Sequence, residues 1–165
     1  MRFKFALASA ALILSSSISH AATFAVPTDN PAATIDIPDT WKPHSADGGV
    51  EGASTDGKVY VFAQGIRGKD GGAAAEAGAK WFEKQGVKLD EKTLASKDVE
   101  INGVKGFNMT ILGVDKIGPT QVSMTFFATK DPEEFVMVSI WGDEVIADNN
   151  LADVGAIVSS IRPTN

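Results

Sequence analysis

Residues suited to covalent or metal chemistry are scarce in this chain. It has no cysteine and only two histidines, His20 and His44. Thiol catalysis, iron–sulfur clusters and thiolate zinc sites all need side chains that the sequence lacks. A zinc or copper site normally combines several imidazole or thiolate ligands, so neither metal is expected. The sequence predicts no metal site and no cofactor.

Serine chemistry has equally little support. A nucleophilic serine needs a base to take its proton and donors to hold the oxyanion, but the chain has no G-x-S-x-G elbow and no S-x-x-K motif. His44 follows a strand end in Lys42-Pro-His-Ser-Ala46, which favours an ordinary loop residue over a member of a catalytic triad. A hydrolase that uses carboxylates in a cleft stays open as an alternative.

Two acidic clusters and one glycine-rich loop are candidates for ion binding. The clusters, 131–134 and 143–150, lack the Asp-x-Asp-x-Asp-Gly spacing of a calcium loop, which favours turn and helix-start acids in contact with water. The loop 65–72 lies between a strand and a helix, where glycine amides can bind phosphate. A P-loop would need Gly at Ala63 and Ser or Thr at Asp70, and Asp70 would repel an anion. We expect a flexible strand-to-helix connection.

Aromatic side chains and loop cations are the remaining candidates for a binding surface. Trp81 and Trp141 fit packing positions on a helix and a strand. Phe127 lies on the otherwise polar side of its strand, which favours burial under another element; the alternative is an exposed contact patch. The candidate interaction surface comprises Trp41, His44, Arg67, Lys69 and Phe127.

The elements that position these residues are extended runs and two helical segments. Asp56-Gly57 and Asn102-Gly103 are strong hairpin signals between apolar runs. Residues 71–85 predict a helix, with Asp70 as N-cap and Gly86 at its end. A second helix is expected within 143–161. Extended segments are expected around residues 23–27, 33–37, 50–54, 58–66 and 93–101, from 104 onward, and around 121–129 and 135–141.

Short hairpin turns favour antiparallel pairing, because parallel strands need long crossover connections. Runs 58–66 and 135–141 are apolar at both alternating sets of positions, which predicts strands covered on both faces. The expected fold class is α+β: a central antiparallel sheet of about six or seven strands sandwiched by helices in an α/β/α arrangement. No repeat or long linker divides the chain, so residues 22–165 are expected to form a single globular domain.

The first 21 residues have the pattern of a secretory signal peptide. Arg2 and Lys4 precede an apolar run, and Ser19-His-Ala21 supplies the small residues of a cleavage site. As a helix, about ten apolar residues span ~15 Å, too little for a hydrocarbon core of ~30 Å. We expect cleavage after Ala21, with Ala22 as the alternative, and a periplasmic or secreted protein without stable membrane insertion. Without a cysteine, a lipid anchor on an N-terminal cysteine is excluded.

The chain is acidic. Its net charge of −6 becomes −8 once residues 1–21 are removed, because they carry two basic and no acidic side chains. Such a surface repels nucleic acid and anionic lipid. We expect a soluble monomer or weak oligomer that binds no nucleic acid.

The order of elements resembles the PsbP-like superfamily, with its Mog-type and DcrB-type members. The resemblance covers residues 24–163 and depends on the Ile35-Asp-Ile-Pro-Asp-Thr-Trp41 entry, the single helix between two hairpins, and the terminal Ser159-Ser-Ile-Arg-Pro163. It implies a central antiparallel sheet between helices and a role as an accessory or docking protein. The favoured function is a non-enzymatic exported protein that binds an envelope protein; the alternatives are the hydrolase and a small-molecule carrier.

Overall fold

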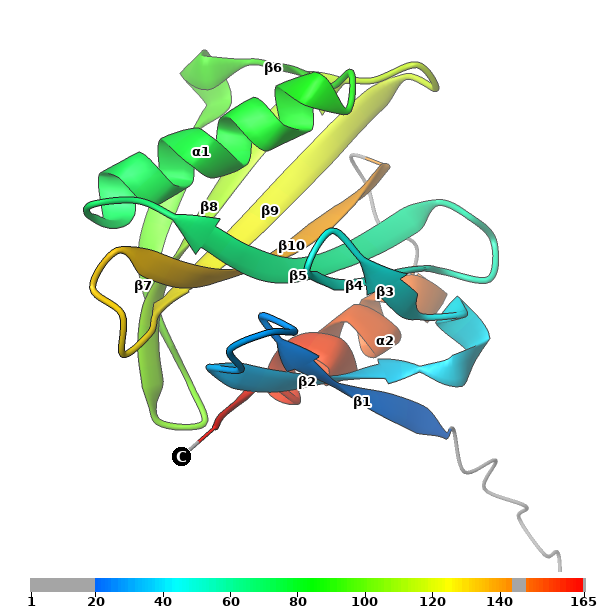
Figure 1. Cartoon of the computed structure of the whole chain (residues 1–165). Coiled ribbons are helices and arrows are strands. Elements are labelled where there is room, and N and C mark those ends of the chain that lie inside the picture. The colour runs from blue at the N-terminus through cyan, green and yellow to red at the C-terminus, as the bar shows by residue number, and fades with distance from the viewer. Residues whose placement is uncertain (1–19, 144–147, 165) are drawn as a thin grey trace, which may run out of the picture.

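Residues 20–143 and 148–164 are described by the structure, a computed structural model in which two sheets and two α-helices pack together (Figure 1). The larger sheet has eight strands in the order β3-β4-β5-β10-β9-β8-β6, with β7 also paired to β8. All of its neighbouring strands are antiparallel. These strands are β3 (His44–Ala46), β4 (Gly49–Ala53), β5 (Val59–Arg67), β6 (Lys88–Leu89), β7 (Ala95–Ile101), β8 (Val104–Val114), β9 (Pro119–Ala128) and β10 (Glu134–Asp143).

A smaller sheet joins the two ends of the described chain. β1 (Ala21–Val26) pairs with β2 (Ala33–Pro38), and β2 also pairs with β11 (Arg162–Pro163). The sequence predicts the first two strands but assigns Arg162 and Pro163 only to the stop after the last helix. The pairing of β11 with β2 joins residues from opposite ends of the chain, so no local sequence pattern predicts it.

The helix α1 (Gly71–Lys84) forms where its end signals predict it. The carboxylate of Asp70 accepts a hydrogen bond from the backbone N–H of Ala73 at 2.8 Å, which satisfies one of the free donors of the first turn. Gly86 has φ +89° and takes the chain away from the helix. The predicted caps are confirmed.

Both predicted hairpins also form. β4 and β5 are joined around Asp56-Gly57, and β7 and β8 around Asn102-Gly103. Asn102 and Gly103 both have positive φ, +50° and +80°, as a two-residue turn matched to strand twist requires. The central strands are also as expected, since β10 lies between β5 and β9.

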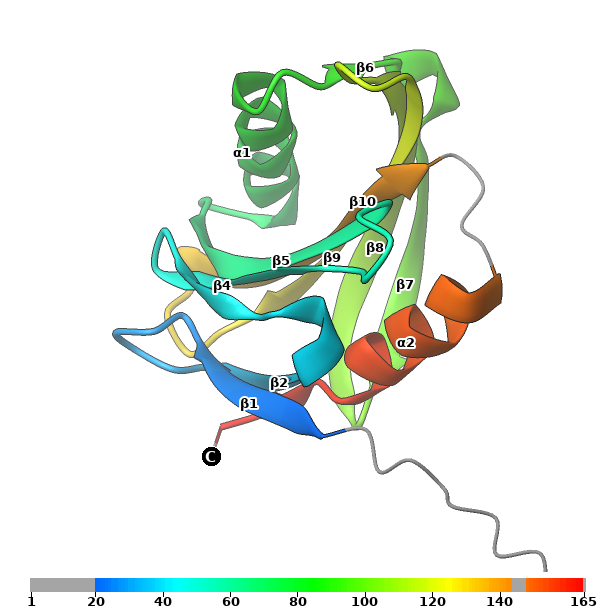
Figure 2. The same ribbon diagram turned by 90° about the vertical axis from the view of Figure 1, so that its right-hand side faces the viewer.

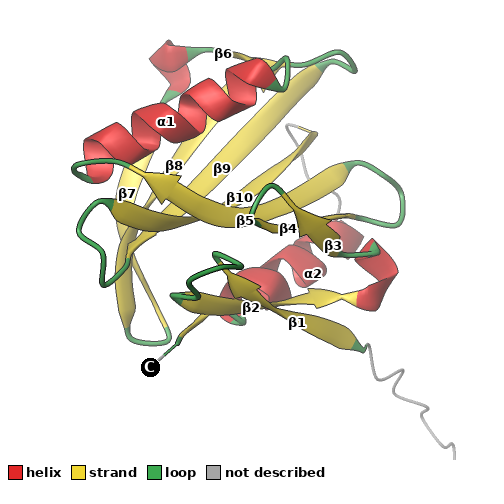
Figure 3. Cartoon of the chain, viewed as in Figure 1, coloured by secondary structure: helices red, strands yellow, loops and turns green. Residues whose placement is uncertain are grey.

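Each face of the larger sheet has its own hydrophobic core. Figure 2 shows α1 on one face of this sheet, and the smaller sheet and α2 on the other. One core lies under α1 and includes Phe82, Phe126 and Met137. The other lies between the two sheets and includes Ile37 and Ile157, the latter from α2 (Asp148–Ser159). The antiparallel α+β class is therefore confirmed, but a layer of helices on each face is not. α1 lies on one face, whereas the smaller sheet lies on the other with α2 beside it (Figure 3).

Candidate functional site

The site begins with the alternation of side chains along β5. Tyr60 and Phe62 face α1, while their neighbours on the strand enter the opposite core. Tyr60 pairs across the sheet with Trp141 of β10, and Phe62 pairs with Glu51 of β4. The strands thus place three aromatic rings and a carboxylate at one end of the sheet.

The helix α1 adds two rings and completes an aromatic network. The rings of Phe62 and Trp81 are stacked, with centroids 4.6 Å apart and an interplanar angle of 12°. Phe82, which is fully buried, meets Trp81 and Trp141 edge-on at 4.8 and 5.8 Å. Tyr60 and Trp141 lie 5.5 Å apart. Rings at such distances attract one another beyond their buried area, so these contacts stabilise the wall.

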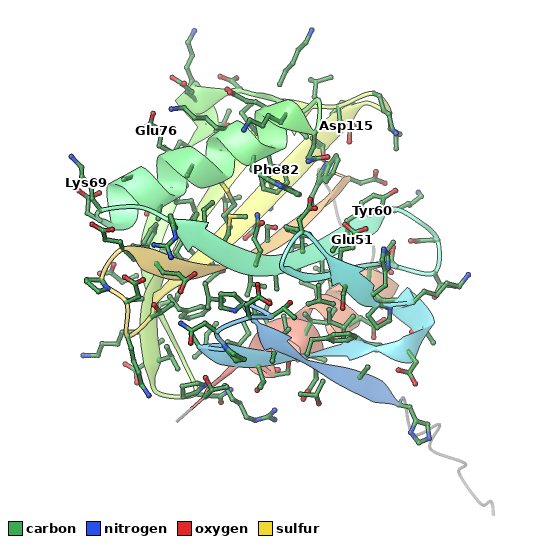
Figure 4. The ribbon with its side chains drawn as sticks, in the orientation of Figure 1. Glu51, Tyr60, Lys69, Glu76, Phe82 and Asp115 are labelled. Atoms are coloured by element: carbon green, nitrogen blue, oxygen red, sulfur yellow. The ribbon has the colours of Figure 1, made fainter. Side chains whose placement is uncertain are left out.

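A groove of about 380 Å³ opens beside these rings. A second hollow of about 470 Å³ continues it along the ends of β9 and β10, because both are lined by Tyr60, Trp141, Asp115 and Ile117. In Figure 4, Glu51 and Tyr60 lie below the end of α1 that carries Phe82, and Asp115 lies beside that end. We call it the aromatic groove and define it by Glu51, Tyr60, Phe62, Trp81, Asp115 and Trp141.

The aromatic groove carries more negative than positive charge. Its lining includes the carboxylates of Asp47, Glu51 and Asp115 but, among described residues, only the ammonium of Lys116 and the imidazole of His44 as bases. His44 Nε2 lies 2.9 Å from Glu51 Oε1. Carboxylates beside exposed aromatic faces attract an organic cation through charge and through the ring quadrupole, which contributes about 0.5–2 kcal/mol.

Among the residues that the structure describes, two carboxyl groups have shifted pKa values, and both shifts are downward. Ser54 Oγ donates a hydrogen bond to Asp56 at 2.6 Å and, with the backbone N–H of Lys58, lowers the pKa of this carboxyl. Lys80 bonds to Glu76 at 2.6 Å and lowers the pKa of Glu76 in the same way. A general acid near neutral pH needs the opposite shift, so these two groups have the character of structural anions.

The structure removes Trp41 and Phe127 from the predicted interaction surface. Trp41 is 1% exposed, and its Nε1 donates to Asp153 Oδ2 of α2 at 2.9 Å. Phe127 is 2% exposed in the core between the sheets. Burial of Phe127, the favoured interpretation, is confirmed; the exposed patch is wrong, because the smaller sheet covers that face.

The other three predicted residues are exposed but are not brought together. His44 lies at the aromatic groove. Arg67 lies at the opposite end of β5, where its Nη1 is 3.7 Å from Asp131 Oδ2. Lys69 lies in the loop before α1, far from Glu51 and Tyr60 in Figure 4. A single surface made of these residues therefore does not form.

The ion-binding candidates take part in turns and ion pairs. In the turn before β10, Asp131 Oδ1 accepts the backbone N–H of Glu133 at 2.9 Å. In the second acidic cluster, Asp143 pairs with Lys58 at 3.6 Å, and Glu144 lies outside the described residues. Within residues 20–143 and 148–164, no group of three or more His, Asp or Glu side chains could hold a metal ion. No helix in the same ranges is long and apolar enough to cross a membrane.

The sequence patterns did not predict the aromatic groove. They predicted packing roles for Trp81 and Trp141, which is correct for the ring contacts that these residues make. They indicated no role for Tyr60 or Asp115. The one available signal was the large aromatic pair Tyr60 and Phe62 on one side of a strand. Nothing local places Trp81 and Asp115 next to them.

Comparison with solved structures identifies the fold. No family model matches the chain, and no curated protein matches its sequence. The cyanobacterial PsbP of Synechocystis, CyanoP, has a TM-score of 0.55 and 11% identity, covering 91% of this chain and 96% of that one. Mog1p, a Ran-binding protein of Saccharomyces cerevisiae, has a TM-score of 0.54 and 10% identity, covering 87% and 95%.

LpqN of Mycobacterium tuberculosis, involved in cell envelope biogenesis, has a TM-score of 0.54 and 10% identity, covering 88% of this chain and 92% of that one. A longer Bacteroides thetaiotaomicron chain has a TM-score of 0.50 at 9% identity, and this chain spans 48% of its length. Identities this low define the fold alone. The chain has the PsbP-like fold, as the resemblance in its sequence implies.

Proposed function

We propose that this chain is a non-enzymatic accessory protein that binds a protein partner through the aromatic groove, which receives a basic side chain of that partner. The carrying observation is an open groove lined by three carboxylates, the exposed ring of Tyr60 and the half-buried rings of Trp81 and Trp141. A lysine or arginine brings both a charge for the carboxylates and a cation for the ring faces. Mog1p, which shares the fold, is itself a Ran-binding protein.

A photo-crosslinking experiment in the cells that make the protein tests this proposal. p-Benzoylphenylalanine replaces Tyr60, which is 38% exposed in the groove. The matched control carries the same probe at Leu151, which is 48% exposed on α2. We expect a discrete crosslinked protein from position 60 and none from position 151. Equal or absent products at both positions would show that the groove is not the binding surface.

We also propose that the protein acts outside the cytoplasm, as a single domain released by cleavage after Ala21. The predicted cleavage point supports this, because it removes only the first residue of β1 and leaves residues 22–26 available to pair with β2. The intact mass of the protein from an envelope fraction tests it. A mass that still includes residues 1–21 would contradict the proposal.

The size of the groove favours one second candidate, a carrier of a small organic cation. Its volume of about 380 Å³ lies within the ~300–1,000 Å³ typical of small-molecule sites. Tetramethylammonium and arginine amide are suitable probes, with sodium chloride at equal ionic strength as the control. Binding to the folded state alone raises the melting temperature. No rise beyond the sodium chloride control would reject this candidate.

A further inference from the structure

A second groove lies on the other side of α1, where the helix leaves part of the sheet uncovered. α1 contacts β5, β9, β10 and the two-residue β6, whereas β8 extends beyond it with Phe107 and Met109 half-buried on the same face. The groove between α1 and the β7–β8 hairpin has a volume of about 790 Å³. Leu94, at its margin, is 47% exposed. The floor of this groove is therefore an apolar sheet face.

The wall that α1 contributes is made of small side chains. Gly72, Ala75 and Ala79 line the groove, and a spacing of three and four residues places them on one side of the helix. Small residues on a helix let another backbone approach closely. The wall thus leaves room for a second helix beside α1.

The rim is acidic on both banks. Glu76 and Glu83 line it from α1, and Glu91 and Asp98 line it from the opposite bank before and within β7. Lys80 offsets part of this charge through its bond to Glu76. The lining itself contains four carboxylates and no lysine or arginine among described residues. We call this surface the acidic groove.

We propose that the acidic groove docks a basic amphipathic helix of a protein partner. The apolar stripe of that helix packs on Phe107, Met109 and Leu94, and its lysine or arginine side chains face the rim carboxylates. A helix beside α1 at the usual interaxial distance of about 8–10 Å would complete the helical layer on this face. α1 has 14 residues, so a partner helix of similar length, about 21 Å, matches the groove.

A helix suits this groove better than an added strand. The floor is the face of the sheet and not its edge, so its backbone groups are already paired within the sheet. A helix pairs its own backbone N–H and C=O groups and contacts the groove through side chains alone. This is the helix-in-groove mode of recognition. The acidic rim also disfavours acidic helices and anionic membranes.

A peptide-binding experiment on the full folded protein tests the proposal. The probe is a fluorescent peptide of about 14 residues with leucines at helical spacing and lysines elsewhere. Its controls are the same composition in scrambled order and a version with glutamate in place of lysine. Fluorescence anisotropy at about 0.1 M and about 1 M salt measures the affinity, since the Debye length falls from about 10 Å to about 3 Å. We expect the amphipathic lysine peptide to bind at least tenfold more tightly than either control at low salt.

Three variants locate the binding. Glu83→Lys with Glu91→Lys reverses one carboxylate on each bank and should weaken binding at least tenfold at low salt, and less at high salt. Ala79→Phe fills the wall without changing charge and should also weaken it. Glu133→Lys reverses one carboxylate at an exposed turn, half of that charge change, and should leave affinity unchanged.

The acidic groove is independent of the aromatic groove, and Tyr60→Ala separates the two. Tyr60 lines only the hollows on the other side of α1, so its removal should leave peptide affinity unchanged. Equal binding of the amphipathic and scrambled peptides would overturn the proposal. So would full affinity in the double reversal, or loss of affinity in Tyr60→Ala. Thermal unfolding of each variant verifies that the fold is intact.

Discussion

Asn102 lies in a turn that the sequence predicts, and its side chain bonds to the end of α2, a contact that only the fold creates. Replacement of Asn102 by glycine tests that contact separately from the turn. Its Nδ2 donates hydrogen bonds to the carbonyl oxygens of Ser159 at 2.8 Å and Ile161 at 2.7 Å. Ser159 is the last residue of α2, and Ile161 directly precedes β11. Glycine adopts positive φ without strain, so Asn102→Gly keeps the turn and removes both bonds.

The expected loss of stability follows from two hydrogen bonds. Each contributes about 0.5–1.5 kcal/mol net, and the exposed position of Asn102 favours the lower half of that range, giving about 1–2 kcal/mol in total. Asn102→Ala loses the same bonds and adds roughly 1 kcal/mol for an ordinary side chain in a left-handed conformation. Alanine should therefore destabilise more than glycine, although alanine is generally the better residue elsewhere.

Urea unfolding followed by tryptophan fluorescence measures these differences as shifts in midpoint at constant slope. Asn30→Gly is the matched control, because Asn30 is exposed and its side chain makes no hydrogen bond to a described residue. It carries the same change in unfolded-chain entropy. If Asn102→Gly unfolds at the midpoint of this control, the bonds to α2 do not stabilise the fold and the reasoning fails.

Three further predictions test other contacts. The pKa of Asp56 is lowered in the folded state, so this carboxylate stabilises the fold above its unfolded pKa of 3.8, and that stability is lost as the pH falls through the lower folded pKa. Asp56→Asn should therefore make the free energy of unfolding depend less on pH in this acid range. An unchanged pH profile would contradict this. Gly78→Val should destabilise by about 1–3 kcal/mol in denaturant, because even a Cβ would lie 2.9 Å from Met137 Sδ. Trp41→Phe should cost about 1–3 kcal/mol and couple to Asp153→Ala in a double-mutant cycle, whereas strict additivity would disprove their hydrogen bond.

The sequence determined the elements whose signals are local. Asp70 and Gly86 mark the ends of α1 because capping involves backbone groups within a few residues. Asn102-Gly103 marks a hairpin because two positive φ angles suit few other residues. The doubly apolar patterns of β5 and β10 predicted central strands because both of their faces had to be buried.

Only the tertiary structure decided what covers each face and where grooves remain. The smaller sheet buries Trp41 and Phe127, and β11 returns from the other end of the chain to add its third strand beside β2. The position of α1 leaves an aromatic groove on one side and an acidic groove on the other. Such surfaces depend on contacts between residues far apart in the chain, such as Phe62 with Trp81. Local periodicity fixes which way a side chain points along its own strand or helix, but not which element packs over it.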